Sequence, residues 1–350
     1  MTRVVILLAA TAVTFAQPRQ SDFSQLTAER QLSDVYQAIF DARFTEVPSL
    51  LARTCPPAPA EACQLLDAVN VWWQIQLDPG SVALDPQFQS KVDATIASTQ
   101  GWAMREPQRA EAWFYVGGAY GARAQWKVLR TERLSAARDG KQIKEALEKS
   151  LALDPRLQEA YFGIGLYHYY AGVAPLAAKM LRWLLMLPGG DKTQGMAEML
   201  RARENGQLLR DEADYQLHII DLWYENKPQQ ALDLLDGLRD RHPRNPLFLQ
   251  LIAQVQDVYF HDHMTSLRTW RSLFDEARSQ RVAKTDLAEI RARLGIAQEL
   301  EHLGDVDGAI DQLREVIAAK PLAPFGAYAE AQRRMSQLVA RQRPRARDAR

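Results

Sequence analysis

The stretch IRARLGIAQELEHLGDVDGAIDQLREVIAAKP, from Ile290 to Pro321, has the pattern of two helices joined by a tight turn. Apolar residues at intervals of three share one side of a first helix: Leu294, Ala297 and Leu300. Gly304-Asp305 supplies the turn, and Pro321 ends a second helix. Ala309 is the small residue at which the two helices would touch. The stretch therefore predicts a helical hairpin.

A second stretch repeats this design. It reads EADYQLHIIDLWYENKPQQALDLLDGLRDRHPRN and runs from Glu212 to Asn245. Ala231 precedes Ala309 by the same number of residues as Pro243 precedes Pro321. Because two segments share one internal spacing, we predict a repeat architecture.

In spacing and residue type, both stretches resemble the tetratricopeptide repeat. The resemblance implies an all-α solenoid of helical hairpins, wound into a right-handed superhelix whose concave surface is lined by the first helix of each hairpin. A looser copy begins near Trp113 and ends at Pro155, with a lengthened hairpin expected over Arg123–Asp139. Apolar residues recur at three and four from Gln31 onward and no run alternates with period two, so we expect helices throughout.

These patterns divide the chain into five parts. We expect a signal peptide over 1–16, a helical region without a clear repeat over 17–105, the repeat array over 106–322, a capping helix over 323–341 and a basic disordered tail over 342–350.

The first residues are typical of a secretory signal peptide. Arg3 precedes the apolar run Val4–Ala10, and Thr14-Phe15-Ala16 fits a cleavage site. The alternative is a short membrane anchor, although an uncleaved anchor would normally be longer. The pattern predicts export to the periplasm or cell envelope.

Two cysteines flank a proline-rich turn. Cys55 and Cys63 enclose PPAPAEA, and in an oxidising compartment they could form a disulfide. The alternative is two separate buried thiols. We favour the disulfide.

A third helical pattern, Val173–Leu187, is strongly apolar. Fifteen helical residues span about 22 Å, less than a hydrocarbon core of about 30 Å. Lys179 and Arg182 share one face, which favours a buried second helix with its cations reaching solvent; contact with a membrane interface is the alternative. The following Gly189-Gly190 lacks the spacing of a phosphate loop, and Asp191 is expected to cap the next helix.

Residues 158–200 also resemble the eukaryotic tetratricopeptide proteins linked to mitochondrial outer membranes and inclusion-body clearance. In both, a glycine-rich first helix leads to an apolar helix and a Gly-Asp turn. The resemblance implies the fold only, since that family offers no catalytic residues.

Motifs of metal or catalytic chemistry are weak. Among six histidines, only His261-Asp262-His263 forms a cluster, and residues two apart on a helix point to different sides. No HExxH or GxSxG motif is present. We therefore expect no metal site, no cofactor and no enzymatic activity; a hydrolase hidden in the array is the weakest alternative.

Large aromatic residues occupy concave positions of the predicted first helices. The repeat register places Phe162, Tyr169, Tyr170, Trp223 and Tyr224 there, where they would form a floor for a protein or peptide partner. The alternative is that they pack against one another as core.

Charge argues against nucleic acid. Lys plus Arg and Asp plus Glu number 43 each, so no overall field would attract a polyanion. We expect an exported scaffold that binds a protein or peptide in its groove, within envelope assembly. The alternative is a peripheral membrane factor docking through 173–187 and the C-terminal arginines.

Overall fold

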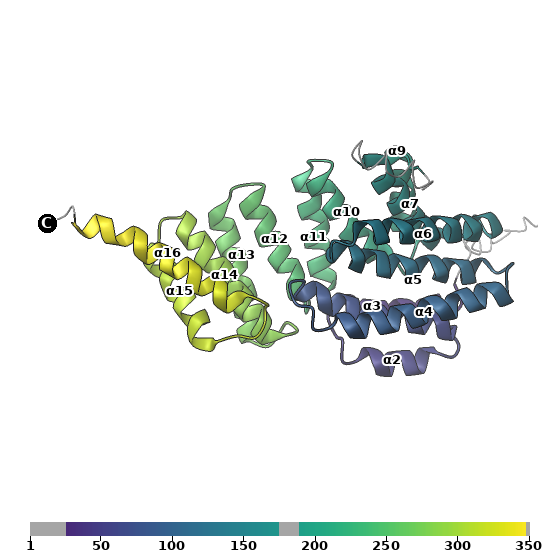
Figure 1. The fold of residues 1–350 in the computed structure, drawn as a ribbon, viewed down its shortest axis with the longest axis horizontal. Helices are drawn as coiled ribbons and strands as arrows, with labels where there is room; N and C mark the ends of the chain where they lie inside the picture. The colour runs from purple at the N-terminus through teal and green to yellow at the C-terminus, as the bar shows by residue number, and fades with distance from the viewer. Residues whose placement is uncertain (1–25, 175–188, 348–350) are drawn as a thin grey trace, which may run out of the picture.

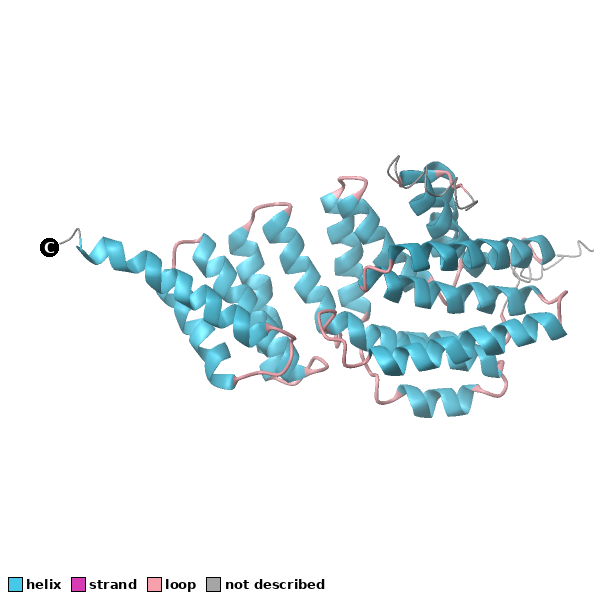
Figure 2. Cartoon of the chain, in the orientation of Figure 1, coloured by secondary structure: helices cyan, strands magenta, loops and turns pink. Residues whose placement is uncertain are grey.

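The computed structural model describes residues 26–174 and 189–347. Within these ranges every regular element is an α-helix and no strand occurs (Figure 2). The helices before the gap are α1 (Glu29–Phe40), α2 (Val47–Thr54), α3 (Ala60–Leu77), α4 (Asp85–Arg105), α5 (Ala110–Leu129), α6 (Arg133–Leu153) and α7 (Gln158–Val173). Those after it are α9 (Lys192–Asn205), α10 (Arg210–Trp223), α11 (Pro228–Arg241), α12 (Pro246–Val258), α13 (His263–Arg278), α14 (Thr285–His302), α15 (Val306–Ala319) and α16 (Ala327–Arg347).

The two hairpins predicted from the sequence are confirmed. They are the pairs α10–α11 and α14–α15. Gly304 turns the chain with a φ of 84°, and the side chain of Asp305 then accepts a hydrogen bond from the N–H of Gly308 at 3.0 Å. Ala231 and Ala309 are both fully buried where the paired helices meet. The short turn and the small contact residue together set the spacing of each hairpin.

Consecutive helices pack mainly on their neighbours in the chain, which makes the molecule an elongated solenoid of helical hairpins (Figure 1). α16 covers the last hairpin at one end. This helix continues to Arg347, whereas the sequence led us to expect a disordered tail from 342. Arginine and alanine have high helix propensity, so the cap extends beyond the last apolar residue of its sequence pattern.

The lengthened hairpin expected over Arg123–Asp139 is confirmed. α5 runs to Leu129 and α6 begins at Arg133, so two long helices are joined by a short turn. The guanidinium of Arg123 donates to both carboxylate oxygens of Asp139, at 2.8 and 2.9 Å. This bidentate pair joins the two helices beyond the length of a standard repeat.

The N-terminal helices fold back against the middle of the array. The hydroxyl of Tyr36 in α1 donates to Glu212 in α10 at 2.9 Å, and the amide of Asn245 donates to the carbonyl of Phe40 at 2.7 Å. Trp73 of α3 is fully buried at this junction. One continuous core therefore extends from Leu26 to Val255.

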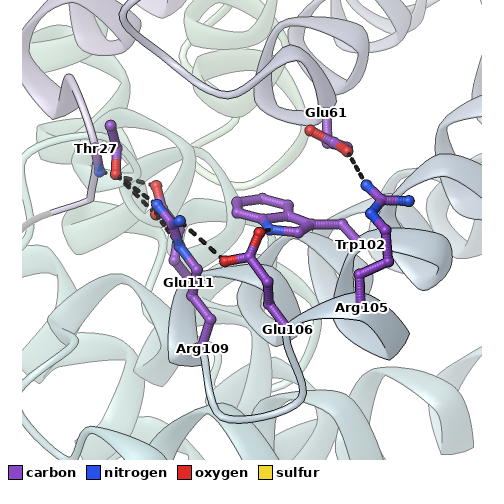
Figure 3. A network of polar contacts seen from close by, with 7 residues as sticks. All are labelled: Thr27, Glu61, Trp102, Arg105, Glu106, Arg109 and Glu111. Atoms are coloured by element: carbon purple, nitrogen blue, oxygen red, sulfur yellow. Dashed lines mark hydrogen bonds and ion pairs between the residues drawn. The ribbon is translucent and has the colours of Figure 1, made fainter.

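A polar network fixes the start of α1 on the turn between α4 and α5 (Figure 3). Glu111 accepts hydrogen bonds from the backbone N–H and the hydroxyl of Thr27 at 2.8 and 2.9 Å. Arg109 pairs with Glu111 at 2.7 Å and with Glu106 at 3.1 Å. The Arg109 hydrogen bond and charge hold the pKa of Glu106 below its usual value. Trp102 donates its ring N–H to Glu106 at 3.0 Å and lies 5.1 Å from the Arg109 guanidinium carbon.

A disulfide joins Cys55 and Cys63, whose Cα atoms are 6.5 Å apart. Cys55 is the C-cap of α2 and Cys63 lies in the first turn of α3. The bridge therefore ties the end of one helix to the start of the next across the proline-rich turn.

No described helix is long and apolar enough to span a bilayer. Most of the apolar pattern Val173–Leu187, with Lys179 and Arg182, lies outside the described residues, as does the predicted signal peptide over 1–16. The expected cap is present, because the Asp191 side chain accepts a hydrogen bond from the N–H of Gln194 at 2.8 Å.

Candidate functional site

A groove of about 1840 Å³ runs along the inner side of the solenoid. Its walls come mainly from α1, α3, α5, α6, α7, α10, α12 and α14. Most of these are the first helices of successive hairpins. The helices that the repeat pattern assigns to a concave face therefore do face one shared groove.

Two of the five aromatic residues predicted to form the groove floor are core residues instead. Tyr169 is fully buried with Met199 and Ile220, and its hydroxyl donates to Glu225. Phe162 is 6% exposed and packs with Ala202 and Ala213, so it reaches the groove only with an edge. Both side chains are covered because α9 packs directly against α7 and residues of α10 join the same apolar clusters. A position that is concave within one hairpin becomes interior where the next hairpin stacks on it.

The other three aromatic residues line the groove with exposed surface. Trp223 is 71% exposed and Tyr224 is 44% exposed, at the end of α10. Tyr170 is half-buried, and its ring lies edge-to-face with that of Tyr224 at 5.6 Å. Tyr169 supports this pair from below, with its ring 6.0 Å from that of Tyr224. Together these residues form an aromatic shelf (Tyr170, Trp223 and Tyr224) on the groove wall.

A series of amide side chains, which no sequence pattern indicated, also lines the groove. They come from five different helices and are Gln76, Gln125, Gln216, Gln250, Gln254 and Gln298. Gln250 and Gln254 lie one turn apart on α12. Their side-chain amides make no hydrogen bond within the described part of the chain. An amide both donates and accepts, so these side chains can pair with the N–H and C=O of a bound polypeptide.

Buried acids also line the groove, on the same two helices, α7 and α10, that carry the aromatic shelf. Glu212 is 4% exposed and accepts from Tyr36 and from Gln216, at 2.9 and 3.2 Å, while burial raises its pKa. Glu159 accepts the backbone N–H groups of residues 207, 208 and 209 at 2.5, 2.9 and 3.0 Å, which fixes the loop before α10. Burial, and then the charge of Glu159, raise the pKa of Glu29 to about 8. A proton retained on Glu29 near pH 7 therefore reduces the negative charge around Glu159, which lines the groove.

Comparisons with known proteins leave the family open. No protein-family model and no curated protein matches this chain. A solved structure described as the "APC/C hetero-tetramer Cut9-Hcn1" is similar over 86% of this chain, with 14% identity and a TM-score of 0.47. The match covers 48% of that protein's chain, so this chain spans about half of its length.

A second group of polar residues meets at the far end of the groove. Asp257, His263, Glu299 and His302 lie with their ligand atoms within 4.8 Å of one another. From the sequence, only His261 and His263 formed a candidate pair of ligands, and we expected no metal site. The available signal was Glu299-x-x-His302, two ligand types one turn apart on a helix. This pattern becomes informative only when the fold brings α12 and α13 beside it.

Proposed function

We propose that this protein is a scaffold that binds an extended segment of another protein in its concave groove. The observation that carries the proposal is that the aromatic shelf and the unpaired side-chain amides of Gln250 and Gln254 line one groove. Aromatic side chains give a large contact area for little conformational entropy, and amides satisfy backbone groups along an extended chain. The two features are complementary to a polypeptide.

The charges lining the groove favour recognition by contact rather than by long-range attraction. The chain has equal numbers of acidic and basic residues. The charged residues that line the groove are two arginines, Arg133 and Arg291, and four acids, which are all buried: Glu159, Glu212, Asp257 and Glu299. Burial raises the pKa of Glu159 and of Glu212. We therefore expect partner binding to weaken little when salt is raised. A peripheral membrane factor, docking through 173–187 and the C-terminal arginines, would instead release from anionic vesicles in high salt.

We further propose that the chain is exported to the periplasm or envelope, where the partner belongs to envelope assembly. The signal-like start and the Cys55–Cys63 disulfide support this location, because disulfides persist in oxidising compartments.

Export predicts a mature chain that begins near Gln17 and carries the disulfide when isolated without reductant. Peptide mapping of the non-reduced protein should recover Cys55 and Cys63 as one linked pair. Cys63→Ser should lower the free energy of unfolding by about 2–3 kcal/mol, as expected for a short closed loop. Two freely alkylated thiols, or a mature protein that keeps Met1 in the cytoplasm, would contradict the proposal.

A mutation at Trp223 tests whether the groove is the binding site of the partner. We expect Trp223→Ala to weaken partner binding by about 2 kcal/mol, or roughly thirtyfold, as for an aromatic anchor in an interface. The thermal midpoint should stay nearly constant, because 71% of the side chain is already exposed. Both quantities are measured on the same preparation, with the partner first captured by crosslinking in envelope fractions.

A photo-crosslinking amino acid gives the matched control. Placed at Trp223 it should form adducts with the partner, whereas at Met104 it should not. Met104 is also highly exposed, at 74%, but lies on α4 and does not line the groove. Equal crosslinking at both positions, or undiminished binding by Trp223→Ala, would exclude the groove as the binding site.

A further inference from the structure

Four side chains from three helix ends converge at the edge of the groove. Asp257 lies in the last turn of α12, His263 is the first residue of α13, and Glu299 and His302 lie in the last turn of α14. The two acids are buried, with exposures of 6% for Asp257 and 0% for Glu299, while the two histidines are partly exposed. A buried pair of carboxylates differs from the solvated acidic clusters that are common on protein surfaces.

Most distances between the facing atoms are near the edge length of a small tetrahedron. Nδ1 of His263 is 3.0 Å from Oδ1 of Asp257, 3.1 Å from Oε2 of Glu299 and 3.1 Å from Nδ1 of His302. Nδ1 of His302 is 3.4 Å from the same Asp257 oxygen and 3.7 Å from the same Glu299 oxygen. Ligands at 2.0–2.1 Å from a tetrahedral Zn²⁺ are about 3.3 Å from one another. Five of the six edges are therefore close to those around a tetrahedral zinc ion, and the sixth is at most 4.8 Å.

Hydrogen bonds alone cannot satisfy this arrangement. Nδ1 of His263 carries at most one hydrogen, yet three acceptor atoms face it. If both histidines were protonated at Nδ1, two N–H groups would point at each other across 3.1 Å. A single cation at the centre interacts favourably with all four atoms at once.

One oxygen of the cluster has no partner at all. Oε1 of Glu299 is buried and makes no hydrogen bond within the described part of the chain. The hydroxyl of neighbouring Ser266 donates its hydrogen bond to the carbonyl oxygen of Ala253, at 3.0 Å. An unpaired buried carboxylate oxygen costs free energy, and coordination of the same carboxylate to a cation would offset that cost.

The surroundings also resemble the outer shell of a metal site. Gln298 donates to Oδ2 of Asp257 at 2.8 Å, which orients the opposite oxygen, Oδ1, toward the histidines. Two of the contributing helices, α12 and α14, end at the cluster and turn their negative dipole ends toward it, whereas α13 begins there with its positive end. Within the described residues, the only ion-pair partners of Asp257 and Glu299 are the two histidines.

We propose that Asp257, His263, Glu299 and His302 form a structural site for a divalent transition-metal ion, and that Zn²⁺ is the ion that suits this site best. Two imidazoles and two carboxylates in tetrahedral arrangement suit zinc, whereas Mg²⁺ and Ca²⁺ prefer oxygen ligands in larger number. Four protein ligands leave no open position, which is typical of a structural rather than a catalytic ion. The ion would join α12, α13 and α14. It would lie beside the groove, because Asp257 and Glu299 also line the groove.

The test uses the tag-free mature chain, stripped with EDTA and titrated with ZnCl₂. We expect one Zn²⁺ per chain by calorimetry and elemental analysis, together with a higher thermal midpoint. Addition of Co²⁺ to the stripped protein should give the intense visible absorption of a tetrahedral complex. No stoichiometric Zn²⁺ binding, or Co²⁺ absorption typical of octahedral coordination, would overturn the proposal.

Three variants locate the ion. His263→Ala combined with His302→Ala should abolish stoichiometric binding, and the isosteric Glu299→Gln should weaken it by at least about a hundredfold, more than loss of an outer-shell partner. His261→Ala is the matched control, since His261 is exposed and outside the cluster, and it should bind Zn²⁺ like the natural chain. Circular dichroism in EDTA checks that each variant is folded. If the double variant does not fold, Glu299→Gln decides, and unchanged Zn²⁺ affinity in that variant would refute the site.

Discussion

Trp73→Ala is expected to lower the free energy of unfolding by about 3–5 kcal/mol, the usual cost of removing a fully buried tryptophan. The indole is 0% exposed, and its ring centroid lies 4.3 Å from that of Phe40, 4.9 Å from that of Tyr215 and 6.4 Å from that of Phe248. These partners belong to α1, α10 and α12, so one side chain joins the N-terminal helices to the middle of the array. Its loss leaves a cavity at the junction between those parts, where only the contact of Phe40 with His242, at 5.3 Å between ring centroids, would remain among the aromatic contacts described.

Trp223→Ala is the matched control, because the same atoms are removed from a side chain that is 71% exposed. Urea denaturation of both variants should separate them clearly, with Trp223→Ala within about 0.5 kcal/mol of the natural chain. The m-value of Trp73→Ala is informative as well. A smaller m-value would indicate that the N-terminal helices detach before the rest unfolds. Equal stability of the two variants would show that the junction contributes nothing to the fold.

The hairpins were predictable because their signals are local. The turn at Gly304-Asp305, the small contact residue Ala309 and the stop at Pro321 act within one segment of chain. Their meaning does not depend on what packs elsewhere, so the same pattern at Ala231 and Pro243 located a second hairpin.

The closure of the N-terminal helices onto α10 and α12 could not be predicted in this way. α3 is buried on several sides, and a helix that is apolar all round carries no direction toward its partners. Its contact with Tyr215 and Phe248 is decided by the curvature of the whole array. Curvature is the sum of small rotations between hairpins, which no single segment encodes.

The residues of the candidate sites also divide into those that local spacing located and those that packing between distant helices decided. Trp223 and Tyr224 follow the repeat register into the groove, whereas Phe162 and Tyr169 are covered by helices that the register ignores. The histidine–carboxylate cluster joins residues of three helices. Spacing along one helix revealed only the pair Glu299 and His302, and two ligands alone do not predict a metal site.

The second large effect is expected at the crossing of α7 and α9, where two glycines let the helix backbones touch. A Cβ atom added at Gly195 would lie 2.4 Å from the backbone N of Tyr169 and 2.5 Å from the carbonyl oxygen of Gly165. Both neighbours are backbone atoms that no side-chain rotation can move. Gly195→Ala must therefore separate the two helices, and we expect a loss of about 3 kcal/mol in unfolding free energy, at the upper end of overpacking costs.

Gly121→Ala provides the control for this prediction. Gly121 also lies within a helix, α5, but a Cβ atom there would meet nothing within 4 Å. Alanine stabilises a helix interior by about 0.5–1 kcal/mol relative to glycine, so this variant should be slightly more stable than the natural chain. The two identical substitutions are thus expected to have opposite signs. Tyr169 contacts Tyr170 and Tyr224 directly, so Gly195→Ala should also disturb the aromatic shelf and weaken partner binding. If Gly195→Ala instead stabilised the protein, α7 and α9 would not touch at these glycines.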